Sequence, residues 1–365
     1  LSLETLTAAR IGGTARFSWN KAAAALAHDL ALAGLRMPQG RLDRMRAEGR
    51  WRGTGDLARG QWEGQVRASG IAPAHPLGPS LAPARASLEG TLLAPLLAQA
   101  SAAFDRAINR ASLAAEAIIR HRAGAARLIV PEARITAAGG ERIAALSQVS
   151  ADIGAAGLGA LRGNLLIGGE GLPQLNARID PAPGGGWSAR LAMADYAAGA
   201  NRVAIPRLAL TQERGGVLRF NGLLAASGAL PGGMLSDLSL PLEGRWSQAG
   251  GLALGTRCTA IRFAALALSG LALEGQSITL CPERGAPMLA YDRALRLAAR
   301  SGPITLAGTL GESPARIAAK GLALRYPSPF AATGLTVEIG AEGSAVALSA
   351  ASLTGRMDGG VGGAF

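Results

Sequence analysis

The chain has 365 residues, of which 49% are apolar, 4% aromatic and 17% charged. This apolar content can bury a large surface, which excludes wholesale disorder, and the absence of a Gly-X-Y period excludes collagen. The formal net charge is +12, and nearly all basic residues are arginines scattered singly along the chain. Because nucleic-acid binders cluster positive charge on one face or helix, we predict no nucleic-acid partner and place the arginines on a solvated outer face.

The first ninety residues are predicted to form an N-terminal β-groove segment. Residues 41–52 and 56–70 are rich in Arg, Trp and Gly and are expected to be strands. The longest apolar run, residues 22–35, contains His28 and Asp29 and is too short to span a membrane. The chain starts with Leu1 rather than methionine. We interpret it as a fragment of a longer protein, with any signal peptide or membrane anchor outside it.

A helical apolar spacing interrupts the strands after residue 90. Steps of three and four predict one amphipathic helix over about residues 92–122, with Pro95 in its first turn. A second short helix is expected over residues 140–146. We therefore predict that residues 91–147 form a helical insertion packed on the sheet. The apolar stripe of the long helix consists of Leu93, Leu97, Ala100, Phe104, Ala107, Ala111, Ala114 and Ile118.

Residues 148–365 are predicted to continue as a second β-segment. Apolar residues alternate with polar or small ones, and glycines recur about every 8–14 residues, which is typical of many short antiparallel strands. The fold class is therefore mainly β: a long twisted antiparallel sheet, curled into a groove or gutter, with one prominent helix. The side chains that we expect to line its apolar wall are Leu218, Phe220, Leu266, Leu268, Leu271, Leu273, Leu295, Leu297, Ile304, Leu306, Leu322, Leu324, Leu335, Val337, Ile339, Val346 and Leu348.

The two cysteines have a spacing that suits one hairpin. A two-residue turn at Ser269-Gly270 would pair Leu268 with Leu271 and, at the far end, Cys258 with Cys281. Directly opposed residues lie within disulfide reach. We therefore predict a disulfide and an oxidising compartment; the alternative is two buried free thiols.

The sequence contains no recognisable catalytic or metal-binding motif. His28, His75 and His121 lie far apart, and neither lysine stands in a phosphate-binding loop. Residues 311–315 weakly resemble a nucleophile elbow, but Pro314 follows Ser313 and indicates a turn. We predict a protein that is not an enzyme and that has no catalytic residue, metal site or cofactor.

An apolar sheet face must be covered by another sheet, by helices or by a ligand. One helix is too little for this much sheet, which leaves a gutter that suits acyl chains or a filled β-sandwich. The few aromatic residues favour an aliphatic gutter with internal width.

The region around the cysteines resembles a known family. Residues 258–275, CTAIRFAALALSGLALEG, followed by Ile278-Thr-Leu-Cys281-Pro282, are similar to the YdbH-type proteins of proteobacteria, relatives of AsmA and TamB. The segment 92–97 and the alanine-rich strands also resemble this family. The resemblance covers about residues 81–365 and rests on pattern and on the cysteine pair.

The resemblance implies a segment of a periplasmic bridge that is anchored in the inner membrane of a Gram-negative bacterium and carries phospholipids between the inner and outer membranes. The implied partners are phospholipids, the two membranes through regions outside this chain, and other envelope proteins. Two alternatives stay open: a β-sandwich scaffold without a lipid path, and an uptake factor for dicarboxylates.

Overall fold

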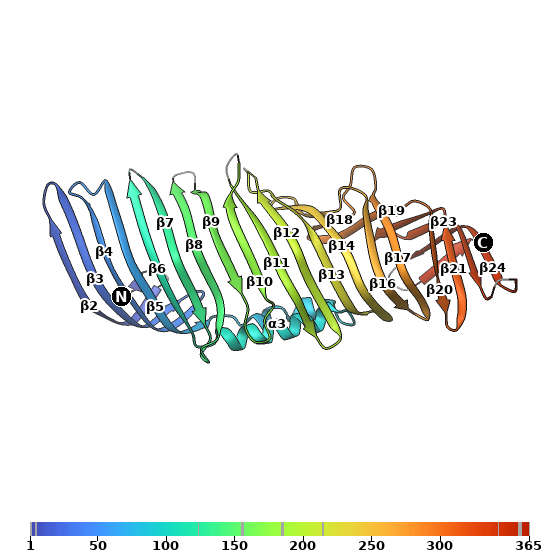
Figure 1. Cartoon of the computed structure of the whole chain (residues 1–365), viewed down its shortest axis with the longest axis horizontal. Helices are drawn as coiled ribbons and strands as arrows, with labels where there is room; N and C mark the ends of the chain where they lie inside the picture. Colours follow the sequence, from blue (N-terminus) through green and yellow to red (C-terminus); the bar gives the residue numbers. More distant parts are fainter. Residues whose placement is uncertain are drawn as a thin grey trace. The chain divides into compact units, whose positions relative to one another are not determined.

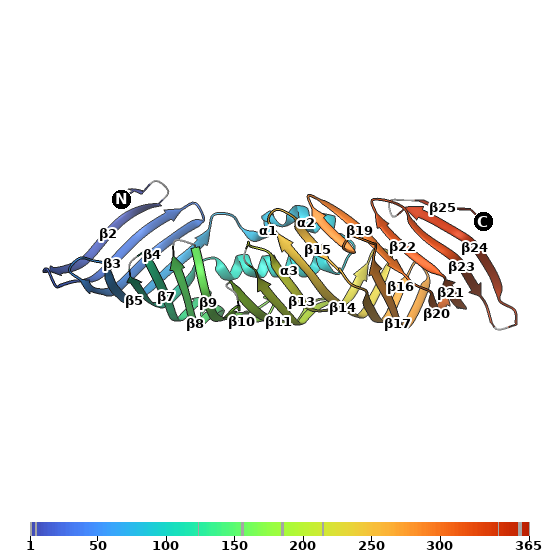
Figure 2. The same ribbon diagram turned by 90° about the horizontal axis from the view of Figure 1, so that it is seen from above.

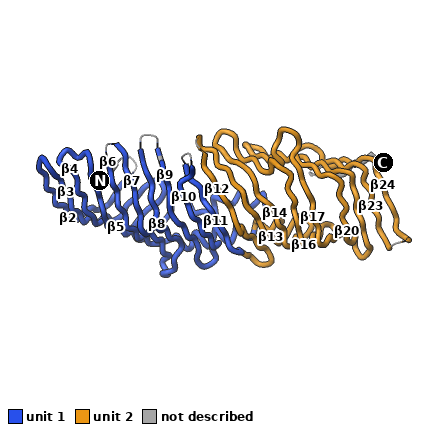
Figure 3. The backbone as a smooth tube through the Cα atoms, turned by 45° about the horizontal axis from the view of Figure 1, so that its top comes forward, with its two compact units in different colours: residues 1–88, 95–196 blue, residues 89–94, 197–365 orange. Residues whose placement is uncertain are grey.

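The computed structural model describes residues 2–3, 6–122, 124–154, 157–183, 186–213, 215–341, 343–356 and 360–364. The chain divides into two compact units (Figure 3). Unit 1 comprises Leu1–Leu88 and Pro95–Tyr196, and unit 2 comprises Glu89–Ala94 and Ala197–Phe365. Within each unit the strands form an antiparallel sheet, so the predicted mainly β architecture is confirmed.

Unit 1 is a meander in which each strand pairs with the next one along the chain (Figure 1). Residues 41–52 and 56–70 fall largely in its strands β4 and β5, as expected. The strands are β1 (Ser2–Leu3), β2 (Leu6–Trp19), β3 (Ala23–Met37), β4 (Gly40–Thr54), β5 (Arg59–Pro73), β6 (Ala111–Arg122), β7 (Ala125–Thr136), β8 (Arg142–Gly154), β9 (Gly157–Ile167), β10 (Leu175–Pro181) and β11 (Trp187–Ala198), whose last two residues fall in unit 2.

Three helices interrupt the meander: α1 (Leu77–Ser80), α2 (Ala82–Ser87) and α3 (Leu93–Ile108). The Asp105 carboxylate of α3 accepts hydrogen bonds from the backbone N–H groups of Leu77 and Gly78, at 2.6 and 2.8 Å, and so fixes the start of α1. Ala103 of α3 belongs to a buried cluster with Ala111, Ile143 and Leu172. This cluster joins α3 to the strand ends of unit 1.

The helix prediction was right as far as Ile108 and wrong beyond it. Residues 111–122 form strand β6, which pairs with β5 and β7. Alanine fits the helical period of 3.6 residues as well as the strand period of 2 residues. The apolar stripe therefore continues into residues 111–122, which pairing with the neighbouring strands holds in an extended conformation. The helix expected over residues 140–146 was also wrong, because strand β8 begins at Arg142 and pairs on both sides.

Unit 2 is a sheet that divides into two branches of strands. Strand β14 pairs with β15 near one end and with β16 near the other. The β15 branch continues through β18, β19 and β22, and the β16 branch continues through β17, β20 and β21. Both branches meet at β23 (Figure 2). The strands are β12 (Asn201–Gln212), β13 (Leu218–Leu230), β14 (Gly233–Ser247), β15 (Gly251–Leu254), β16 (Thr259–Leu268), β17 (Leu271–Pro282), β18 (Leu289–Asp292), β19 (Ala294–Ser301), β20 (Ile304–Leu310), β21 (Ser313–Ala319), β22 (Gly321–Tyr326), β23 (Phe330–Ile339), β24 (Val346–Arg356) and β25 (Gly360–Ala364).

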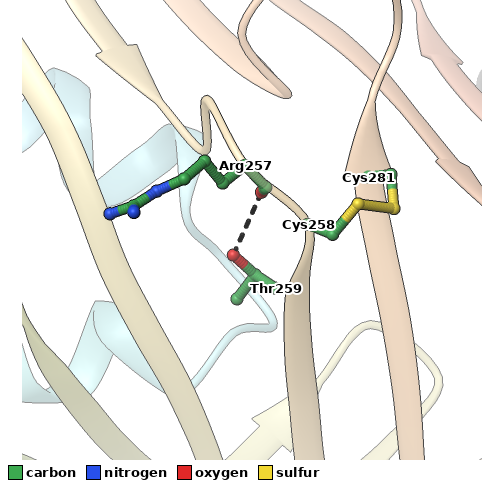
Figure 4. The surroundings of a disulfide bond; sticks show 4 residues. All are labelled: Arg257, Cys258, Thr259 and Cys281. Atoms are coloured by element: carbon green, nitrogen blue, oxygen red, sulfur yellow. Dashed lines mark hydrogen bonds between the residues drawn. A yellow bond between two sulfur atoms is a disulfide. The ribbon is translucent and has the colours of Figure 1, made fainter.

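The cysteine hairpin is confirmed with the predicted register. Ser269 and Gly270 form the turn with φ of 50° and 87°, and Leu268 pairs with Leu271. Cys258 and Cys281 form a disulfide with their Cα atoms 3.9 Å apart (Figure 4). The bond lies where the chain leaves β15 for β16 and where the end of β17 pairs with β19. It therefore links the two branches of the sheet at their junction.

Candidate functional site

Cross-strand pairing aligns apolar residues in rows across unit 1. Paired residues share a face of the sheet, so these rows make one face of unit 1 apolar from β2 to β11. The first row consists of Ile11, Leu32, Met45, Ala68, Leu113, Ile135, Ala144, Ile167, Leu175 and Met193, and the second of Gly13, Leu30, Ala47, Val66, Ala115, Ala133, Leu146, Leu165, Ala177 and Leu191.

The alternate residues of the same strands make the opposite face polar. Arginines recur there, and a few of them pair with acidic side chains, as in the bidentate contact of Arg46 with Asp29 at 2.7 and 2.9 Å. The hydrogen bond from Arg46 lowers the pKa of the Asp29 carboxyl below its usual value. The scattered arginines thus occupy the solvated face, as the sequence analysis proposed for the net charge.

The apolar face of unit 1 is open over part of its area. Ile11, Ile119 and Leu146 lie on this face and are 44%, 40% and 39% exposed. A core packed between two layers would bury such side chains. Leu32 and Met45 beside them are half-buried against their neighbours in the sheet. The face therefore offers aliphatic surface to a ligand.

Two tryptophans lie flat on this face near the β4–β5 turn. The Trp62 ring is nearly coplanar with His28, at an angle of 9°, and its Nε1–H donates to His28 Nε2 at 2.8 Å. The Trp51 and His121 rings are also nearly parallel, at 8°, with their centres 5.9 Å apart. An in-plane hydrogen bond requires side-by-side rings rather than a face-to-face stack. We call these four rings the aromatic floor.

Glycines make room for the aromatic floor. A Cβ atom on Gly49 would lie 2.6 Å from the Trp62 indole nitrogen, and one on Gly53 would lie 2.4 Å from the Trp51 ring. Gly60 and Gly64 are equally close to these rings. The Trp and Gly residues that mark β4 and β5 in the sequence thus form one packing arrangement.

Substitution of Gly49 by alanine tests this arrangement. The three atoms nearest to the new methyl all belong to the Trp62 ring, so we expect the indole to lose its hydrogen bond to His28 and the free energy of unfolding to fall by about 1–3 kcal/mol. The Trp62 indole N–H resonance and urea unfolding measure the two effects.

Two control variants make this test specific. Gly12→Ala, at a glycine with no atom within 4 Å of the added methyl, should cost little. A Gly49→Ala change made in a Trp62→Leu background should also cost less than it does alone, because the clashing ring is gone. Equal costs in both backgrounds would contradict the proposed contact.

Unit 2 also has an apolar face made of rows. One row of paired residues passes through both cysteine-hairpin strands and ends on β24. Another row crosses the β15 branch of the sheet. The first consists of Gly228, Leu235, Leu266, Leu273, Gly308, Ala315, Ile339 and Val346, and the second of Phe220, Gly244, Leu254, Leu289, Leu297 and Tyr326.

The registers place the wall residues expected from the sequence on this one face. Leu306 aligns through Ile317 with Val337 and Leu348, while Leu268 and Leu271 oppose each other beside the first row. Alternation or pairing connects the remaining members to these rows: Leu218, Leu295, Ile304, Leu322, Leu324 and Leu335.

The expected wall residues differ in accessibility. Val346 and Leu348 are 63% and 60% exposed, whereas Leu273 is 3% exposed and packs in a cluster with Leu235 and Phe263. Leu273 therefore contributes to the core and offers no surface to a ligand, which corrects its assignment as an open wall position.

Sequence reasoning expected a β-groove over residues 1–90 but named none of the side chains on the apolar face of unit 1. Leu26, His28, Leu30 and Leu32 alternate on β3, and this pattern could have revealed it. Phe263 was missed for a different reason, because the alternation of inward-facing residues changes along β16.

The described residues contain no group of three or more His, Cys, Asp or Glu side chains able to hold a metal ion. None of the described helices combines the length and hydropathy needed to cross a bilayer. Residues 311–312 form the turn between β20 and β21, as expected for the weak elbow resemblance. No family model matches the chain, and no curated protein or solved structure shows significant similarity to it.

Proposed function

We propose that the apolar faces bind the acyl chains of phospholipids and that the protein is a segment of a periplasmic, inner-membrane-anchored bridge that carries phospholipids between the two membranes. The observation that carries this proposal is the continuity of the apolar rows from strand to strand, combined with exposed aliphatic side chains on the same face. Acyl chains lying across the strands would meet apolar side chains at every step, while headgroups stay in water.

Passive partitioning is the mechanism that fits such a surface. Each fully buried CH₂ group contributes about 0.8 kcal/mol, which is an upper bound on a partly open face. Affinity should therefore rise with acyl-chain length and depend little on the headgroup. The disulfide supports an oxidising compartment.

Photo-crosslinking tests the proposal. A photoreactive side chain at Val337 or Leu30, both on apolar faces, should form phospholipid adducts that mass spectrometry identifies after incubation with vesicles. Glu338 follows Val337 and points to the opposite face of unit 2, and Ala27, on the strand of Leu30, points to the opposite face of unit 1, so they serve as matched controls. Equal adduct yields from both faces would contradict the proposal.

A charged substitution separates lipid binding from structural packing. We expect Val337→Glu to reduce the lipid adducts formed from Leu306 while the circular dichroism spectrum stays unchanged; Thr336→Glu, on the other face, should alter neither. Loss of the folded spectrum in Val337→Glu alone would favour the scaffold alternative, in which this face is a filled core.

A further inference from the structure

The polar face of unit 1 carries a hollow with an unusual charge. Its volume is about 740 Å³, and it extends over strands β2 to β7. Five arginines line it: Arg10, Arg44, Arg46, Arg67 and Arg134. Not one aspartate or glutamate is among the described residues that line it. We call it the arginine hollow.

Three hydroxyl groups add further donors to the arginines, and the other lining residues are small or apolar. Ser69, Ser112 and Thr136 line the hollow, and successive strand pairings place them in one row with Arg44. Hydroxyls donate to anionic oxygens, and guanidinium groups donate in a fork that matches phosphate oxygens. The arginine hollow thus combines two donor types that suit the same kind of ligand.

The arginines are only partly compensated within the protein. Arg46 stands directly opposite Arg67 in the register, an arrangement that is unfavourable for like charges. Asp29 and Glu48 hold Arg46, but the hydrogen-bonding partner of the Arg67 side chain is the neutral Gln65. Among the described residues, no acidic group forms an ion pair with Arg10 or Arg44. An anion in the hollow would relieve this repulsion.

A neighbouring hollow on the same face provides an internal comparison. It also has a volume of about 740 Å³, and Arg16 and Arg50 belong to its lining together with Arg46. Four carboxylates line it as well: Asp29, Glu48, Glu63 and Glu116. Two hollows of equal size on one face therefore differ in charge, so the excess of arginine is local to one of them.

We propose that the arginine hollow binds a ligand through phosphate groups, with their oxygens held by Arg10, Arg44 and Arg67. Because the hollow lies on the face opposite the apolar rows, this site is distinct from the acyl-chain surface and does not depend on it. The phosphate can belong to a soluble phosphorylated compound or to the headgroup of an anionic lipid. Binding should weaken as ionic strength rises, because salt screens exposed charges.

Binding measurements on the full chain test the site with two probes. Inorganic pyrophosphate represents soluble ligands in calorimetry, and vesicles of phosphatidylglycerol, compared with phosphatidylcholine, represent headgroups in cosedimentation. We expect the double variant Arg44→Gln/Arg67→Gln to weaken binding of the effective probe by about tenfold or more. Arg16→Gln/Arg50→Gln removes the same charge from the neighbouring hollow and should change affinity less than about twofold.

The outcomes decide both the site and its ligand source. Binding that weakens in Arg44→Gln/Arg67→Gln supports the site. If pyrophosphate binds in this way, the ligand is a soluble one; if phosphatidylglycerol vesicles do so and pyrophosphate does not, the ligand is a lipid headgroup. Equal losses in both double variants, or failure of both probes to bind, would overturn it. Arg10→Gln, a single change at an exposed position, repeats the test if the double variant does not fold.

Discussion

Replacing Phe263 with alanine is expected to destabilise the cysteine-hairpin region of unit 2 by about 3–5 kcal/mol. Phe263 is 7% exposed and packs with Leu235 and Leu273, and Ile278 and Leu306 pack against the same cluster. Removal of the ring leaves a cavity that the backbone pairing of β14, β16 and β17 prevents from closing. The expected cost includes both the lost burial and this cavity.

Hydrogen exchange measures this effect locally. Peptides that cover β16 and β17 should exchange about a hundredfold faster or more in Phe263→Ala, since each 1.4 kcal/mol corresponds to about a factor of ten. Phe17→Ala is the matched control, because Phe17 is the same residue type on an apolar face but is 66% exposed. It should cost less than about 1 kcal/mol. A similar cost at both positions would show that Phe263 is not part of a buried core.

The position of Phe263 also shows where sequence patterns reach their limit. On β16, Phe263 packs in the same cluster as Leu266, an odd spacing that strict alternation forbids. The break coincides with Gly275 on the paired strand, whose φ is +59°. The bent backbone changes which residues point inward. Strict alternation identified Leu266 and Leu268 and therefore placed Phe263 on the wrong face.

Local chemistry was predictable where it depended on few residues. The Ser269-Gly270 turn fixes the register of its own hairpin, and the register then dictates the cysteine pairing. The strand at 111–122 was unpredictable for the opposite reason, because its extended form depends on β5 and β7 as neighbours. The arginines of the arginine hollow come from four strands that only the register brings together.

Removal of the disulfide by Cys258→Ser/Cys281→Ser is expected to cost about 3 kcal/mol, the value of the chain-entropy model for a loop of this length. The sequence separation is 23 residues. Beyond this entropy, the bond holds the point at which β15 passes into β16, and the short pairing of Leu280–Pro282 with Ala299–Ser301 lies directly beside it. We therefore expect the loss to concentrate at this junction.

Urea unfolding with and without reductant measures the total cost, and hydrogen exchange locates it. Reduced wild-type protein should match the double variant, since both lack the same bond. The amides of Leu280 and Cys281 and of residues 299–301 should lose more protection than those of the Ser269-Gly270 turn, because the turn keeps its own hairpin hydrogen bonds when the sulfur bridge is gone. If reduction leaves the free energy of unfolding unchanged, the disulfide is not the element that joins the two branches of the sheet. If protection falls evenly along the hairpin, the loss of stability comes from the entropy of the unfolded chain alone, and the junction does not depend on the disulfide.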